Sequence, residues 1–171
     1  MTVLQGLRRY GNDKPLDALK CLPYSIRMFW IHAYQSYVWN KMATQRLKLG
    51  TTPLLGDLYL DSKESDKIKV VTDASSVSLS QIVLPLSGYN VRYPLNSVGE
   101  MYTQFLEKEE GITFKKKVSD ESTPKGAYRR LIALPKSFEW EKVQTQNVPN
   151  DEFTVETAIF KFSLCSGSLM G

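Results

Sequence analysis

Residues 25–49, SIRMFWIHAYQSYVWNKMATQRLKL, carry the pattern of one long helix. Apolar side chains recur there at steps of three and four, as on one face of an amphipathic helix. They are Ile26, Phe29, Trp30, Ala33, Tyr37 and Leu47. Gly50 follows, and a glycine directly after a helix supplies a left-handed stop. The sequence therefore predicts a helix over residues 25–49.

The same segment carries a second, mostly polar stripe. His32, Gln35, Trp39 and Arg46 fall within roughly 60° of one another on a helix that turns about 100° per residue. A helix with apolar and specific polar faces on several sides is covered on most of its surface, which predicts a position inside the domain. Gln35 and Asn40 would then need hydrogen-bond partners, and anchoring of neighbouring loops is favoured over contact with a ligand.

Further elements lie on both sides of this helix. Pro15 begins a short helix that ends before Pro23, with Asp13 as a possible cap. Ser97 and Glu100 form a capping-box pattern that begins a helix ended by Gly111. Strands are predicted over residues 54–60, 67–72, 81–86, 90–93, 128–134 and 153–164. This order of helices and strands predicts an α+β fold.

Charge is distributed unevenly along the chain, whose net charge is +4. Residues 1–50 hold eight basic and two acidic residues, while residues 51–124 hold eight basic and eleven acidic residues. Residues 125–171 hold six basic and five acidic residues. A basic first third favours a polyanionic partner, although a solvated basic surface explains the same composition equally well. Charge and periodicity change together near residues 50 and 124, which predicts a middle segment inserted between two ends of one domain.

Composition excludes several classes of protein. An apolar fraction of 42% is typical of a globular chain, and its apolar runs, such as residues 82–86, are far too short to span a bilayer. The first ten residues contain no apolar stretch of a secretory signal, so a nuclear or cytoplasmic location is expected. The two cysteines are expected to stay reduced. His32 is the only histidine, so no metal site is expected.

Several short motifs, taken in order, resemble one family. They are HAYQS at residues 32–36 with Asn40 and Arg46 following, GDL at 56–58, IVLPLSG at 82–88, YP at 93–94, GAYRR at 126–130 and FSL at 162–164. Their order and spacing resemble the TruD/Pus7 family of RNA pseudouridine synthases, and most closely its eukaryotic Pus7-like branch. The resemblance covers nearly the whole chain, and the helical motif is its most specific part.

The resemblance implies a fold and an activity. Residues 1–50 and 125–171 would belong to a catalytic domain, and residues 51–124 would form the inserted TRUD domain. The implied reaction is the isomerisation of uridine to pseudouridine in tRNA or mRNA, without cofactor or metal. RNA would be the partner, no membrane would be involved, and a monomer is expected.

Two departures from the family pattern bear on activity. The family's catalytic aspartate lies in a Lys-Asp motif upstream of the helix, and no Lys-Asp dipeptide occurs in these 171 residues. Near the other end, Cys165 stands where the family has proline, and residues 169–171 stand where the family's Tyr-Ala-Thr begins. The expectation is therefore an enzyme fragment that is inactive alone. The alternatives are a non-catalytic RNA-binding module and an α+β protein-interaction domain.

The candidate RNA-binding residues are basic or amide side chains of the two ends. They are Arg8, Arg9, Gln35, Asn40, Arg46, Arg129 and Arg130. Arg129 and Arg130 are adjacent on a predicted strand, so they point to opposite faces and only one can face a cleft. Arg46 can equally complement the dipole at the end of its helix. The lysines at 115–117 are interpreted as a solvated run, with contact to an RNA backbone as the alternative.

Overall fold

A computed structural model describes residues 2–61, 67–113, 124–143 and 157–164 of the chain. Its helices are α1 (Val3–Tyr10), α2 (Pro15–Lys20), α3 (Tyr24–Lys48) and α4 (Ser97–Thr103), with two 3-10 turns, η1 (Ala74–Ser76) and η2 (Leu79–Gln81), and a π-helical segment, η3 (Gln104–Glu109). Its strands are β1 (Leu58–Asp61), β2 (Lys67–Val70), β3 (Ile82–Leu86), β4 (Ala127–Arg130), β5 (Pro135–Val143) and β6 (Thr157–Leu164). The predicted α+β class is confirmed.

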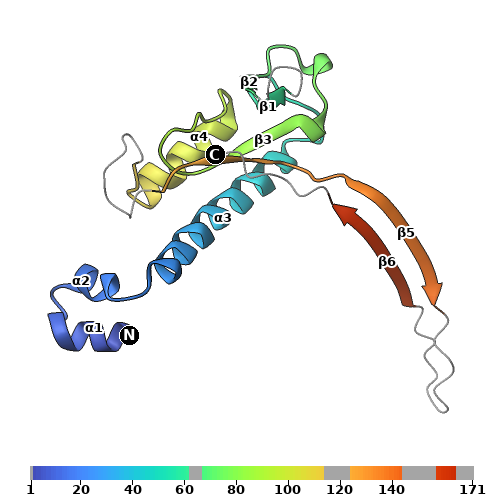
Figure 1. Ribbon diagram of the computed structural model, residues 1–171. Coiled ribbons are helices and arrows are strands. Elements are labelled where there is room, and N and C mark those ends of the chain that lie inside the picture. Colours follow the sequence, from blue (N-terminus) through green and yellow to red (C-terminus); the bar gives the residue numbers. More distant parts are fainter. Residues whose placement is uncertain (1, 62–66, 114–123, 144–156, 165–171) are drawn as a thin grey trace, which may run out of the picture.

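The strands form two separate sheets (Figure 1). The larger sheet has the order β2-β1-β3-β4, and each pair of neighbours in it is antiparallel. Strands β5 and β6 form a two-stranded antiparallel ribbon that projects from the body of the molecule. In the larger sheet β4 is an edge strand, so the backbone groups along its outer side are not used by a sheet neighbour within the described residues.

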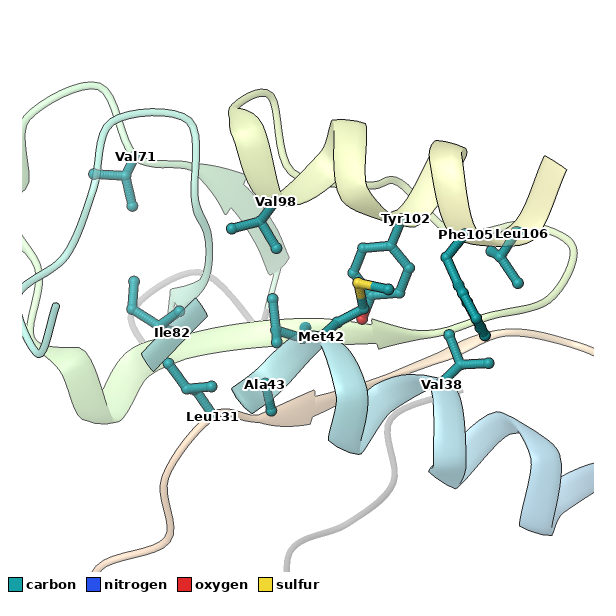
Figure 2. Packing of buried hydrophobic residues seen from close by; sticks show 11 residues of the cluster. Val38, Met42, Ala43, Val71, Ile82, Val98, Tyr102, Phe105, Leu106 and Leu131 are labelled. Carbon is teal, nitrogen blue, oxygen red and sulfur yellow. The ribbon is translucent and has the colours of Figure 1, made fainter. Parts of the chain in front are cut away.

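The main hydrophobic core lies between α3, α4 with η3, and strand β3 (Figure 2). Helix α3 contributes Val38, Met42 and Ala43, and the α4 side contributes Val98, Tyr102, Phe105 and Leu106. The buried side chains of both helices thus meet over one face of the sheet. A second, smaller cluster covers the opposite face with Leu58, Leu60 and Val83. Strand β3 is buried along its whole length because both faces are covered.

The predicted long helix is confirmed as α3, but its predicted burial is wrong for the apolar stripe, whose residues are exposed in both halves of the helix. The buried residues of α3, from Gln35 to Arg46, lie on another face and from the middle of the helix onward, where it crosses β3 and α4. In the first half, Phe29 is 69% exposed and Trp30 is 46% exposed. An apolar face predicts a surface that avoids water, but only packing decides which part of it is covered by the described chain.

Other differences concern caps and pairing. The cap of α4 is Asn96 rather than Ser97, since the Asn96 side chain accepts a hydrogen bond from the Val98 amide at 3.1 Å. Residues 90–93, predicted as a strand, are not one. The residue before them, Tyr89, makes a single isolated bridge to Lys125. Helix α1, with a Thr2/Gln5 capping box, and strand β5 are additional to the predicted elements.

The domain division stays a prediction. Helix α3, from the first predicted segment, packs on β3 and α4 of the second, and β4 of the third pairs with β3. Residues 115–117, Cys165 and residues 169–171, to which the sequence drew attention, lie outside the described residues. Within the described ranges, no helix is long and apolar enough to cross a membrane.

Candidate nucleic-acid interface

Gln35 anchors two loops to helix α3. Its amide nitrogen donates to the Ser87 carbonyl at 2.8 Å and to the Lys125 carbonyl at 3.2 Å. Its amide oxygen lies 2.9 Å from Nδ1 of His32. Gln35 is buried, and these three contacts satisfy an amide that would otherwise be costly to bury. The predicted loop-anchoring role of Gln35 is confirmed, and His32 has a hydrogen-bonding role beside it.

The two loops held by Gln35 also bond to each other. The Tyr89 amide donates to the Pro124 carbonyl at 3.0 Å, and the Gly126 amide donates to the Tyr89 carbonyl at 2.9 Å. A Cβ atom on Gly88 would lie 2.5 Å from the Gly126 nitrogen, so the close approach requires glycine. The IVLPLSG and GAYRR motifs therefore meet at one place, directly before strand β4.

Arg129 and Arg130 leave β4 on opposite faces, as predicted. Arg129 lies opposite Leu84 of β3 and places its guanidinium carbon 5.2 Å from the ring centroid of Trp39 on α3. Arg130 is exposed and donates to the Ser80 carbonyl at 3.0 Å. The Trp39 indole is itself fixed, because its Nε1 donates to the Leu84 carbonyl at 3.3 Å.

Arg46 has a different role from the one considered in the sequence. Its side chain has no exposed surface, and its Nη2 lies 2.7 Å from Oδ2 of Asp57, which is also fully buried. The guanidinium further donates to the carbonyls of Gly50 and Thr52. All of its donors face the protein interior, so Arg46 is unavailable for contact with RNA and is removed from the candidate interface.

The remaining candidates lie in separate places. Arg8 and Arg9 are exposed in the last turn of α1, and Arg9 lies over the Tyr10 ring at 5.5 Å. Helix α1 lies beyond the first residue of α3 (Figure 1), whereas Arg129 contacts Trp39, which is roughly 22 Å further along that helix. Asn40 is exposed on α3. The structure thus brings Gln35 and Arg129 into one region and leaves Arg8 and Arg9 in another.

Lys125 is an exposed cation of the β4 region that the sequence pattern does not predict. It lies between Pro124 and Gly126, and its carbonyl is held by Gln35 while its side chain is left on the surface. In the sequence, only its position directly before the GAYRR motif points to Lys125. A single lysine in a loop is too common for that position to predict a role. Together, Lys125, Arg129 and Arg130 make a basic edge, which we call the β4 edge.

The described aspartates are engaged or lie on the open surface. Asp57 is bound by Arg46 and by the Leu54 amide, and Asp61 lies 2.9 Å from the Lys69 ammonium. Hydrogen bonds from Ser75 lower the pKa of the Asp73 carboxyl, which caps η1. Asp13 and Asp17 are exposed. In the described part of the chain, no group of three or more histidine, cysteine or acidic residues could hold a metal ion.

Comparison with known proteins agrees with these motifs. The family model described as tRNA pseudouridine synthase D (TruD) matches residues 1–169. Pseudouridylate synthase 7 homolog of Mus musculus is 36% identical over 143 residues, covering 82% of this chain and 22% of that protein. Pseudouridylate synthase PUS7L of Homo sapiens is 30% identical over 162 residues, covering 85% of this chain and 23% of that protein.

A more distant relative is the multisubstrate pseudouridine synthase 7 of Schizosaccharomyces pombe. It is 29% identical over 178 residues, covering 86% of this chain and 26% of that protein. The chain thus spans about a quarter or less of the length of these relatives. The family match nevertheless runs through nearly all of the 171 residues. The chain therefore belongs to the TruD family of pseudouridine synthases.

Proposed function

We propose that this chain supplies one wall of the RNA-binding cleft of a pseudouridine synthase that acts on tRNA or mRNA. The observation that carries this proposal is the β4 edge, where Arg129 and Arg130 on an edge strand and Lys125 in the loop before it provide three cations in a TruD family member. Cations on a firm backbone are suited to RNA phosphates, because phosphate contacts fix the position of a nucleic acid.

Arg129 is the residue of this edge whose position is best defined. Stacking on Trp39 restrains its planar guanidinium, and Trp39 is held to β3 by a hydrogen bond. A restrained guanidinium loses less side-chain freedom when it binds a phosphate than a free lysine does. In this proposal Arg129 faces the cleft on the α3 side and contacts the RNA backbone there, and Trp39 positions Arg129. Arg130, on the opposite face, contacts the backbone outside the cleft, where the RNA passes the edge.

The reaction itself requires a group that this chain is not expected to supply. In pseudouridine formation the bond from N1 of uracil to the ribose is broken, the base turns, and C5 is bonded to the same carbon. The proton on C5 is lost and N1 is protonated, so no cofactor or energy source is consumed. The family uses an aspartate in a Lys-Asp motif, and such a motif is absent from the 171 residues. Asp57 cannot replace it, since its carboxylate is buried and bound to Arg46.

Loss of the C5 proton gives a direct assay. RNA labelled with tritium at C5 of uridine should release no tritium above a buffer blank when it is incubated with this chain alone. The mouse Pseudouridylate synthase 7 homolog serves as the positive control under the same conditions. Tritium release by this chain, abolished in D13N, D17N or D73N, would show that the chain carries its own nucleophile and would refute this part of the proposal.

RNA binding is measured separately from turnover. The proposal expects the chain to bind single-stranded RNA with an affinity that falls steeply as salt is raised. Absence of any salt-dependent RNA binding would instead favour a protein-interaction domain.

A further inference from the structure

A second polar region lies on the α4 side of the molecule. A pocket of about 730 Å³ opens between residues 92–96 and one face of α4 and η3. Its polar lining consists of Arg92, Asn96, Glu100, Thr103, Gln104 and Lys108. This volume lies within the range of small-ligand pockets and is large enough for a single nucleotide.

One wall of the pocket is held in place from behind. The Leu95 amide donates to the Gly56 carbonyl at 2.7 Å, and the Asn96 amide group donates to Asp57 Oδ1 at 2.9 Å. On the opposite side, a Cβ atom on Gly99 would lie 1.9 Å from the Pro94 carbonyl oxygen. Only glycine therefore allows α4 to lie so close to the loop. The pocket is formed before any ligand arrives, which lowers the entropy lost on binding.

The other wall has an unusual backbone. Glu100, Gln104 and Lys108 follow one another at steps of four and line the pocket together. Gln104 and Lys108 belong to η3, which is π-helical. π-Helical segments are rare and are found frequently at functional sites, because they cost stability relative to an α-helix. Here the π-helical segment presents an amide and an ammonium to the pocket.

The charges in the pocket fit a nucleotide. Arg92 and Lys108 are exposed, and neither side chain has an ion-pair or hydrogen-bond partner among the described residues. Two uncompensated cations are suited to a phosphate. The Glu100 carboxylate is negative and repels a phosphate, but it can accept hydrogen bonds from the hydroxyl groups of a ribose. A ligand that carries both groups is matched better than phosphate alone.

We propose that this pocket binds one nucleotide of a single-stranded RNA segment, with Arg92 and Lys108 on its phosphate and Glu100 on its ribose 2′-hydroxyl. The inference rests on the proposed RNA-binding function. The pocket adjoins the β4 edge, because the Arg92 amide donates to the hydroxyl of Tyr128 at 2.6 Å, and Tyr128 lies on the same face of β4 as Arg130. One RNA strand can therefore contact both places.

The test compares three double variants in binding to a single-stranded RNA oligonucleotide and to its DNA counterpart at one salt concentration. R92Q/K108Q removes the pocket cations. K48Q/K67Q removes two exposed cations that belong to neither the pocket nor the β4 edge, and so is matched in charge. R129Q/R130Q reports on the β4 edge. E100Q is measured as a fourth protein, and circular dichroism confirms that each variant is folded.

R92Q/K108Q should lose about tenfold in RNA affinity, because charge-assisted hydrogen bonds are among the stronger ones, while K48Q/K67Q loses about twofold or less. E100Q should lower the preference for RNA over DNA, because the carboxylate acceptor for the 2′-hydroxyl becomes an amide. An R92Q/K108Q affinity equal to that of K48Q/K67Q overturns the pocket proposal. If R129Q/R130Q still loses affinity in that case, the proposed function stands without the pocket; if no protein binds RNA, both fail.

Discussion

The guanidinium of Arg46 and the carboxylate of Asp57 form an ion pair in which neither side chain has exposed surface. Arg46 lies in the last turn of α3, and Asp57 lies in the turn before β1. Asp57 also accepts from the Leu54 amide at 2.9 Å and from Asn96, the cap of α4. This one pair therefore ties the end of α3 to the sheet and to the wall of the nucleotide pocket.

Removing one partner of this pair should be strongly destabilising. R46M leaves the Asp57 charge buried without its counter-charge, which costs about 3–5 kcal/mol in the free energy of unfolding. The double variant R46M/D57L should be less destabilised than the sum of its two single variants, because it leaves no isolated charge. Urea unfolding of the four proteins measures both quantities. A cost below about 1 kcal/mol for R46M would contradict the buried, paired geometry.

Gln35 should contribute to stability through the two loops it holds. Q35M keeps the length of the side chain but leaves the carbonyls of Ser87 and Lys125 without their donor, at a cost of about 1–3 kcal/mol. Q45M is the control on the same helix, since the Gln45 side chain makes no hydrogen bond to a described residue. Chemical unfolding should separate the two variants clearly. Equal stability of Q35M and Q45M would show that the loops are not anchored by Gln35.

Tyr102 should make the fold sensitive to alkaline pH. Burial, followed by the nearby Tyr93, raises the pKa of the Tyr102 hydroxyl well above its ordinary value of 10.0. Above that value the unfolded chain releases this proton while the folded chain retains it, so stability falls as pH rises beyond 10. Below pH 10 the Tyr102 hydroxyl is protonated in both the folded and the unfolded chain, so it adds no pH dependence to the stability.

The matching variant is Y102F, which cannot ionise at this position. It should lose about 0.5–1.5 kcal/mol at neutral pH, because the hydroxyl no longer donates to the Pro85 carbonyl. Above pH 10 its stability should fall less steeply than that of the unmodified protein. Parallel slopes of unfolding free energy against alkaline pH would exclude Tyr102 as the responsible group.

The sequence predicted the existence of elements better than the face that each one buries. Strand β3 follows from its continuous apolar run, which is buried along its whole length. Helix α3 follows from its helical periodicity, but the face it buries is not the one that the apolar stripe marks. Residues 90–93 have strand-forming composition but form no ladder with any described part of the chain, and composition alone cannot reveal this. The π-helical form of η3 likewise depends on packing that no short pattern records.

The candidate site was predicted less completely, for a related reason. Gln35 could be recognised as an anchor because a buried amide needs partners, although its partners, Ser87 and Lys125, could not be named. Arg46 was ambiguous because a cation at a helix end also suits the helix dipole, and Asp57 approaches it only through the fold. The stacking of Arg129 on Trp39 joins residues far apart in sequence, so it becomes visible only in the structure.

Trp39 should affect RNA binding without a change in charge. W39L removes the ring beneath Arg129 and should weaken RNA affinity about two- to fivefold, the magnitude of an exposed cation–π contact. W39F retains a ring and should retain most of the affinity. Because the number of phosphate contacts is unchanged, the salt dependence should stay the same in both variants. An unaltered affinity in W39L would show that Trp39 does not position Arg129 for RNA.

The most direct test of the account is the salt dependence of RNA affinity in two charge-matched triple variants. R9Q/R129Q/R130Q removes arginines of α1 and the β4 edge, and K115Q/K116Q/K117Q removes the lysine run. Each lost phosphate contact should flatten the slope of log affinity against log salt by about 0.7 for a single strand. The arginine variant should bind more weakly and show the flatter slope, while the lysine variant stays close to the unmodified protein. A larger loss of affinity in the lysine variant would place the RNA surface in the middle segment and contradict its assignment to the β4 edge.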